Sequence, residues 1–102
     1  MTCAVVVLLE TKTIPAGEDV SLYCTVRDGA HAKWMRGQQI LFPAAEGILP
    51  SELRDRLSLR KRGRQLQELY LRKANVNDSN VYTCLDGSIR NVTNLRILGM
   101  SQ

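Results

Sequence analysis

The side chains of this chain that are most able to do chemistry are three cysteines and one histidine, Cys3, Cys24, Cys84 and His31. Two cysteines can pair as a disulfide, which leaves the third without a partner. A zinc site is not indicated, because zinc ligands come as closely spaced cysteine pairs or with several histidines. A single histidine in an expected loop, without clustered carboxylates or a glycine-rich phosphate loop, assembles no catalytic site. The sequence therefore predicts neither an enzyme nor a metal or cofactor site.

A second candidate for chemistry is the basic cluster at 60–64, which contains Arg60, Lys61, Arg62 and Arg64. Such a cluster attracts acidic protein surfaces, heparan sulfate or phosphate, and it suits a solvated turn equally well. The chain has 14 Lys and Arg against 10 Asp and Glu, and the resulting charge of +4 is compatible with ordinary solubility. Nucleic-acid binding is not expected, because no aromatic residue is interleaved with the cluster.

Two N-glycosylation sequons begin at Asn77 and Asn91. We expect Asn91 to be the better acceptor, because it falls in a predicted surface hairpin. Asn77 adjoins Asp78 at a predicted corner, where a glycan would be crowded. The two sequons are a weak indication of a secreted or cell-surface protein.

These residues must be positioned by a single domain of β-strands. A length of 102 residues suits one core, and 44% hydrophobic with 24% charged residues excludes a disordered chain. The apolar run at 4–9 is too short to span a bilayer and lacks the flanks of a signal peptide, so it predicts an edge strand. We expect membrane attachment through a further part of the protein.

Apolar and polar residues alternate with period two, and turn residues interrupt them every eight to twelve positions, which indicates antiparallel strands. No stretch of ten residues keeps an apolar helical face. The pattern predicts a loop at 43–55, containing a turn at 50–53, and eight or nine short strands in a two-layer sandwich. The main expected strands lie at 19–27, 32–36, 39–42, 47–49, 56–61, 65–73, 80–85 and 92–98.

Cys24, Trp34 and Cys84 fall on inward-facing strand positions, and Tyr82 precedes Cys84 by two residues. This order resembles the immunoglobulin superfamily, and its variable-like set especially. The resemblance implies an immunoglobulin-like sandwich with one disulfide between the sheets, from Cys24 to Cys84, against which Trp34 packs. It leaves Cys3 as a free thiol near the first strand.

The run from Leu69 to Cys84 carries further features of that superfamily. Leu69 and Leu71 are expected to face the core, and the Tyr82 hydroxyl is expected to bind the loop backbone before it. In variable-like domains a salt bridge often closes the bottom of the sandwich, and Arg56 and Asp78 match that pair.

A narrower resemblance covers roughly residues 20–102. The segments that carry it lie at 39–41, 50–56, 77–84 and 95–102, and the most specific stretch is 47–62. They are similar to the amino-terminal domains of helper T-cell co-receptors for MHC class II. In that family an exposed apolar residue and a basic residue face MHC class II. The resemblance places the apolar position at Ile48, or else at Leu49, and the basic position at Lys61 with Arg60 nearby.

The resemblance therefore implies a cell-surface recognition domain, residues 1–102, which would be the first extracellular domain of a larger type I membrane receptor and would bind MHC class II. Immunoglobulin-like domains also occur as structural modules of giant muscle proteins in the cytoplasmic sarcomere, which is the alternative function and location. A third possibility is cell adhesion by like-with-like contact, which predicts self-association through an exposed sheet face.

Overall fold

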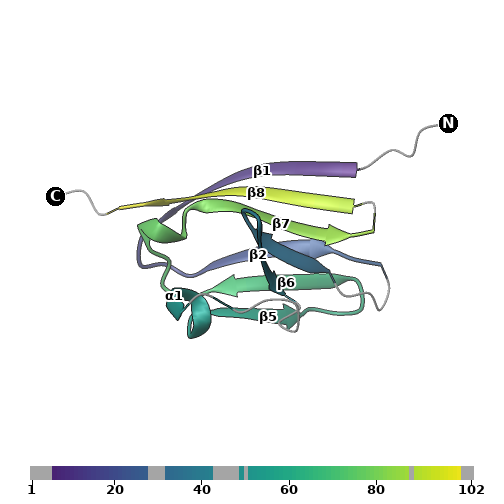
Figure 1. Ribbon diagram of the computed structural model, residues 1–102, viewed down its shortest axis with the longest axis horizontal. Coiled ribbons are helices and arrows are strands. Elements are labelled where there is room, and N and C mark those ends of the chain that lie inside the picture. Colours follow the sequence, from purple (N-terminus) through teal and green to yellow (C-terminus); the bar gives the residue numbers. More distant parts are fainter. Residues whose placement is uncertain (1–5, 28–31, 43–48, 50, 88, 100–102) are drawn as a thin grey trace.

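The computed structural model describes residues 6–27, 32–42, 49, 51–87 and 89–99, which form two facing β-sheets (Figure 1). In this part of the chain the first sheet has five strands, in the order β1 (Val6–Pro15), β8 (Ile89–Leu98), β7 (Asn80–Asp86), β3 (Lys33–Arg36) and β4 (Gln39–Phe42). The second has three, in the order β2 (Val20–Thr25), β6 (Leu66–Leu71) and β5 (Leu57–Lys61). The predicted two-layer antiparallel sandwich is confirmed.

The five-stranded sheet ends in a parallel edge strand. β1 runs beside β8 in parallel from Val6 opposite Ile89 to Pro15 opposite Leu98, while the other neighbouring strands are antiparallel. The edge strand expected from the amino-terminal sequence is therefore present over 6–15. The last strand begins at Ile89, three positions before the predicted start, because it continues the ladder with β7 up to the turn at Gly87.

The core lies between the sheets, where alternate side chains of β2, β7 and β8 are buried. On β2 the inward row contains Val20, Leu22 and Cys24, as the alternation predicts. Leu69 and Leu71 on β6 are buried at 1% and 3% exposure, so both core assignments are confirmed. The two sheets bury their apolar faces against each other, which removes this surface from water.

Two short helical turns interrupt the sandwich. The predicted turn at 50–53 is instead a one-turn helix, α1 (Ser51–Arg54), which buries Leu53 completely. A 3₁₀ turn, η2 (Val76–Asp78), precedes β7 and is capped by Asn75, whose side chain accepts from the Asn77 N–H at 2.9 Å. Among the described residues, no helix has the length and apolar character needed to cross a bilayer.

Candidate functional site

The predicted signature residues meet at the centre of the sandwich. Cys24 on β2 and Cys84 on β7 form a disulfide between the sheets, with Cα atoms 6.3 Å apart. Trp34 pairs with Cys84 on the neighbouring strand and is 2% exposed, and its Nε1–H donates to Oε1 of Gln67 at 3.4 Å. The disulfide and the inward position of Trp34 are therefore confirmed. Gln67 is a core residue that the sequence analysis missed, although it lies in the same alternating row as the buried leucines of β6.

Tyr82 forms the predicted bond to the loop before it. Its buried hydroxyl donates to the main-chain oxygen of Asp78 at 2.7 Å. Burial raises the pKa of Tyr82 to about 12, so the phenol stays neutral and remains a donor at physiological pH. This bond ties the start of β7 to η2.

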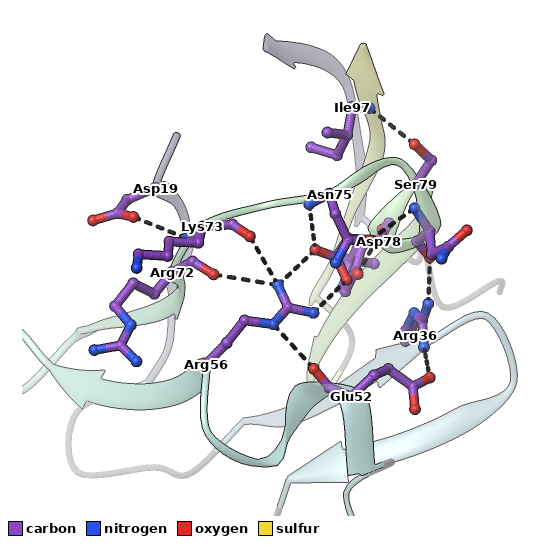
Figure 2. A network of polar contacts seen from close by, with 12 residues as sticks. Asp19, Arg36, Glu52, Arg56, Arg72, Lys73, Asn75, Asp78, Ser79 and Ile97 are labelled. Atoms are coloured by element: carbon purple, nitrogen blue, oxygen red, sulfur yellow. Dashed lines mark hydrogen bonds and ion pairs between the residues drawn. The ribbon is translucent and has the colours of Figure 1, made fainter. Parts of the chain in front are cut away.

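Arg56 and Asp78 form the predicted salt bridge at the bottom of the sandwich. Nη1 of Arg56 donates to Oδ2 of Asp78 at 2.8 Å and Nη2 donates to Oδ1 at 3.0 Å (Figure 2). Asp78 is fully buried, while the Arg56 side chain is 17% exposed. The hydrogen bonds to Asp78 raise the pKa of Arg56 above its ordinary value. A paired guanidinium and carboxylate of this kind hold each other's geometry through two parallel bonds.

Arg56 also binds the backbone of two further segments around it. Its Nε donates to the carbonyl oxygen of Glu52 at 3.0 Å, and its Nη1 donates to those of Arg72 and Lys73 at 3.2 and 3.1 Å (Figure 2). One side chain therefore joins α1, the turn after β6 and η2.

A second arginine reinforces this corner from β3. Nη2 of Arg36 donates to the carbonyl oxygen of Asn77 at 2.7 Å, and its Nη1 lies 3.7 Å from Oε1 of Glu52 (Figure 2). The sequence analysis did not single out Arg36, because its contacts come from segments 16 and 41 positions away. Together the two arginines position α1, and with it the start of β5.

The four predicted ligand-binding residues do not form one described cluster. Ile48 lies outside the described residues, and Leu49 is half-buried and packs against the core. Arg60 pairs with Glu68 and Lys61 pairs with Gln67, so the two basic side chains project to opposite faces of the sheet. Both are exposed. Of the four, Lys61 and Arg60 remain as described exposed positions, on different sides of β5.

Arg60 lies over an aromatic ring on the outer face of the three-stranded sheet. Its guanidinium carbon is 3.9 Å from the centre of the Tyr70 ring, a cation–π contact. The Tyr70 hydroxyl donates to Asp19, which also accepts from the Lys73 N–H at 2.9 Å. The Tyr70 hydrogen bond, followed by that of Lys73, holds the pKa of Asp19 below its ordinary value.

Glu68 is a buried carboxylate on that same outer face, covered by its neighbours. It accepts from the Ser21 hydroxyl and from Nε of Arg62, the latter at 2.6 Å. These two hydrogen bonds, Ser21 first, hold the pKa of Glu68 below its ordinary value of 4.5. Glu68 lies on the outward side of β6, and its burial comes from the residues packed over it.

Replacing Glu68 by glutamine is expected to reduce the acid sensitivity of the fold. Because the folded pKa of Glu68 is depressed, the stability that its charge contributes is present above pH 4.5 and is lost as pH falls through the folded value. Urea unfolding at pH 7 and pH 3 should show a smaller loss of stability for Glu68→Gln than for the parent. Glu18→Gln, in the exposed turn after β1, is the matched control and should lose as much as the parent. Equal losses of stability in all three proteins would contradict a lowered pKa of Glu68 in the folded state.

The two sequons differ from the prediction in their accessibility. Nδ2 of Asn91 donates to Sγ of Cys24 at 3.2 Å, and its Oδ1 is buried without a hydrogen-bond partner. The amide that an oligosaccharide would modify thus points at the disulfide, because Asn91 occupies one of the inward-facing positions of β8. Asn77 is exposed on η2. The surface position expected for the Asn91 amide is therefore contradicted, and the expectation that Asn91 is the better acceptor stays a prediction.

The outer face of the five-stranded sheet carries an unbroken row of mostly apolar side chains. Cross-strand pairing aligns one residue from each strand in this row, which runs through Ile40, Met35, Thr83, Val92 and Leu9. Leu9 is 74% exposed and the other four are half-buried. The sequence analysis missed this row because it depends on the register of all five strands. We call it the apolar row.

Two of the chemically distinctive residues fall outside the described part of the chain, Cys3 and His31. Among the residues that are described, no group of three or more His, Cys, Asp or Glu side chains is placed to hold a metal ion.

No protein-family model and no curated protein sequence matches the chain. Solved structures do match it. An Ig-like domain of human obscurin-like protein 1 is 24% identical, with 93% of this chain and 82% of that one covered and a TM-score of 0.72. The titin I9–I11 tandem is 14% identical with a TM-score of 0.71, over 89% of this chain and 31% of the tandem. The chain thus spans about a third of that tandem.

A further match is Dpr2 Ig1–Ig2 in complex with DIP-Theta Ig1–Ig3, at 19% identity and a TM-score of 0.71, over 88% of this chain and 46% of that one. The ZIG-8 IG1 homodimer is similar at 23% identity and a TM-score of 0.65, over 88% of this chain and 79% of that one. At these identities the likeness establishes the fold. The chain has an immunoglobulin-like fold.

Proposed function

We propose that this chain is a cell-surface immunoglobulin-like recognition domain that binds a protein partner. The main support for the proposal is the apolar row, which is accessible on the outer face of the five-stranded sheet. Exposed apolar stripes rimmed by polar residues are characteristic of protein interfaces. The similar Dpr2 and ZIG-8 domains, which occur in a complex and in a homodimer, support a protein partner.

A cell-surface location is supported by the buried disulfide and by the exposed sequon at Asn77. Structural disulfides persist in oxidising compartments, whereas the cytosol keeps such thiols reduced. The alternative is a structural module of a muscle protein. The similarity to titin favours it, but that similarity is one of fold alone. Mass spectrometry of the protein from its native cell separates them. A glycan on Asn77 supports the surface location, and free thiols at Cys24 and Cys84 would support the cytosol.

The specific partner that we propose is MHC class II. Its support is the similarity of 47–62 to helper T-cell co-receptors, in which an apolar and a basic residue face that ligand. Ile48 is the apolar position to test, since Leu49 contributes to the core. Lys61 is the basic position, and its exposed side chain lies on the face of β5 away from the Arg60–Tyr70 contact.

Changing Ile48 and Lys61 to alanine together is expected to abolish binding of the purified domain to MHC class II of the same species, measured by surface plasmon resonance. Arg96→Ala removes an exposed cation from the other sheet and is the control that should bind normally. Retained binding by the double variant would overturn the site.

The apolar row favours a second candidate, like-with-like adhesion. Val92→Glu places a charge within this row and separates the two functions. Loss of self-association in analytical ultracentrifugation with this variant, together with no effect of the Ile48 and Lys61 changes, would support adhesion.

A further inference from the structure

A second surface, on the opposite side of the sandwich, concentrates positive charge. On the outer face of the three-stranded sheet, the alternation of the chain directs to the same side Arg60 of β5, Arg62 directly after β5 and Arg72 directly after β6. Arg64 follows at the tip of the connecting hairpin. We call these four arginines the basic face. The carboxylates beside them are Glu68 and Asp19, together with Asp55 at the end of the face that holds Arg60 and Arg72.

Two of these carboxylates, Glu68 and Asp19, are already occupied. Glu68 binds Arg62 and Ser21, and Asp19 binds the Tyr70 hydroxyl and the Lys73 N–H. Among the described carboxylates, none forms an ion pair with Arg60 or Arg72, and both arginines are exposed. Stacking on Tyr70 holds the Arg60 guanidinium flat, so that its N–H groups stay available at its edges.

The basic face is hollowed at both ends of the β5–β6 hairpin. One hollow of about 510 Å³ lies at the tip and is lined by Arg62, Arg64 and Thr25, among others. Another of about 380 Å³ lies at the far end and is lined by Arg60, Arg72 and Tyr70, among others. Ser58 in the second hollow and Arg62 in the first are four positions apart along the extended chain, a span of about 13 Å. An extended anionic chain laid along the hairpin would reach both hollows.

We propose that the basic face binds a sulfated polysaccharide. Arginines pair with sulfate oxygens through two parallel N–H bonds, and a linear polyanion supplies several such groups in sequence. A protein ligand fits less well, because protein interfaces need apolar anchors. Of the large hydrophobic side chains that the structure shows exposed, Tyr23 alone belongs to this sheet. Single-stranded nucleic acid needs open aromatic faces for its bases, and Arg60 covers one side of Tyr70.

The biological relevance of this inference rests on the proposed cell-surface location, where such polysaccharides occur. Its test does not depend on that location. Purified domain is titrated against immobilised heparin at several salt concentrations, alongside a double variant, Arg60→Gln with Arg72→Gln. The matched control carries Arg90→Gln and Arg96→Gln, which remove two exposed cations from the other sheet and leave the net charge of the two variants equal.

The basic-face variant should lose on the order of tenfold in affinity at low salt, and its slope of log K against log salt should fall by about two. The control should keep most of the affinity. Equal losses in both variants would show attraction to net charge alone and would overturn the proposal. Equal binding of desulfated heparin, or tighter binding of single-stranded DNA, would also overturn it. Free thiols in the native protein would contradict the cell-surface function and leave the heparin result standing.

Discussion

Asp78→Ala is expected to lower the free energy of unfolding by about 3 to 5 kcal/mol, the largest effect of any single substitution in this corner. The Asp78 carboxylate is fully buried and accepts both terminal nitrogens of Arg56 and the Asn75 N–H, the last at 2.8 Å. Its removal leaves a guanidinium whose side chain is only 17% exposed without its ion-pair partner. Removing one partner of a buried pair is destabilising because the other charge keeps its desolvation penalty.

A double-mutant cycle with Arg56→Ala tests the physical reason, by urea unfolding at pH 7. The double variant should be less destabilised than the sum of the two single variants, because it leaves no unpaired buried charge. Asp19→Ala is the matched control, since Asp19 is exposed and sits on a neighbouring turn, and its loss should be much smaller. Additive effects of Arg56→Ala and Asp78→Ala would contradict the ion-pair assignment.

Removing the disulfide by Cys24→Ala with Cys84→Ala is expected to cost about 4 kcal/mol of stability, because the bond closes a loop with a sequence separation of 60. In a domain of this size that loss should lower Tm by about 20 °C. The bond joins the two sheets beside Trp34, so the variant would also leave space at the centre of the core.

Thermal unfolding followed by circular dichroism measures this effect. The reduced parent protein should have the same Tm as the double variant. The Tm of Cys3→Ala should equal that of the parent, since Cys3 is expected to be a free thiol. Equal Tm values for the reduced and the oxidised parent would show that the cross-link does not stabilise the domain.

Neither prediction needs the identity of the ligand, and both concern residues that the sequence already marks. Cys24, Trp34, Tyr82 and Cys84 could be assigned because side chains in strands alternate with period two, and because their order resembles a known superfamily. The salt bridge from Arg56 to Asp78 followed from the same resemblance. Local periodicity and spacing carry this information, so the fold class and its central cross-link could be predicted without a structure.

The surfaces could not be predicted in the same way, because they depend on the register between strands and on what packs over them. Glu68 has the parity of an exposed residue and is buried by Arg62 and Ser21. Asn91 belongs to a sequon in an expected hairpin, and its amide faces the disulfide.

The proposed binding residues show the same division. The basic cluster at 60–64 is visible in the sequence, but only the pairing of β5 with β6 places Arg60 and Lys61 on opposite faces. The apolar row joins residues from five strands that are far apart in the chain, and no local pattern contains it. The sequence by itself determined the sandwich and its core, because burial alternates along each strand. The tertiary structure decided which exposed groups act together, because that is set by contacts between strands.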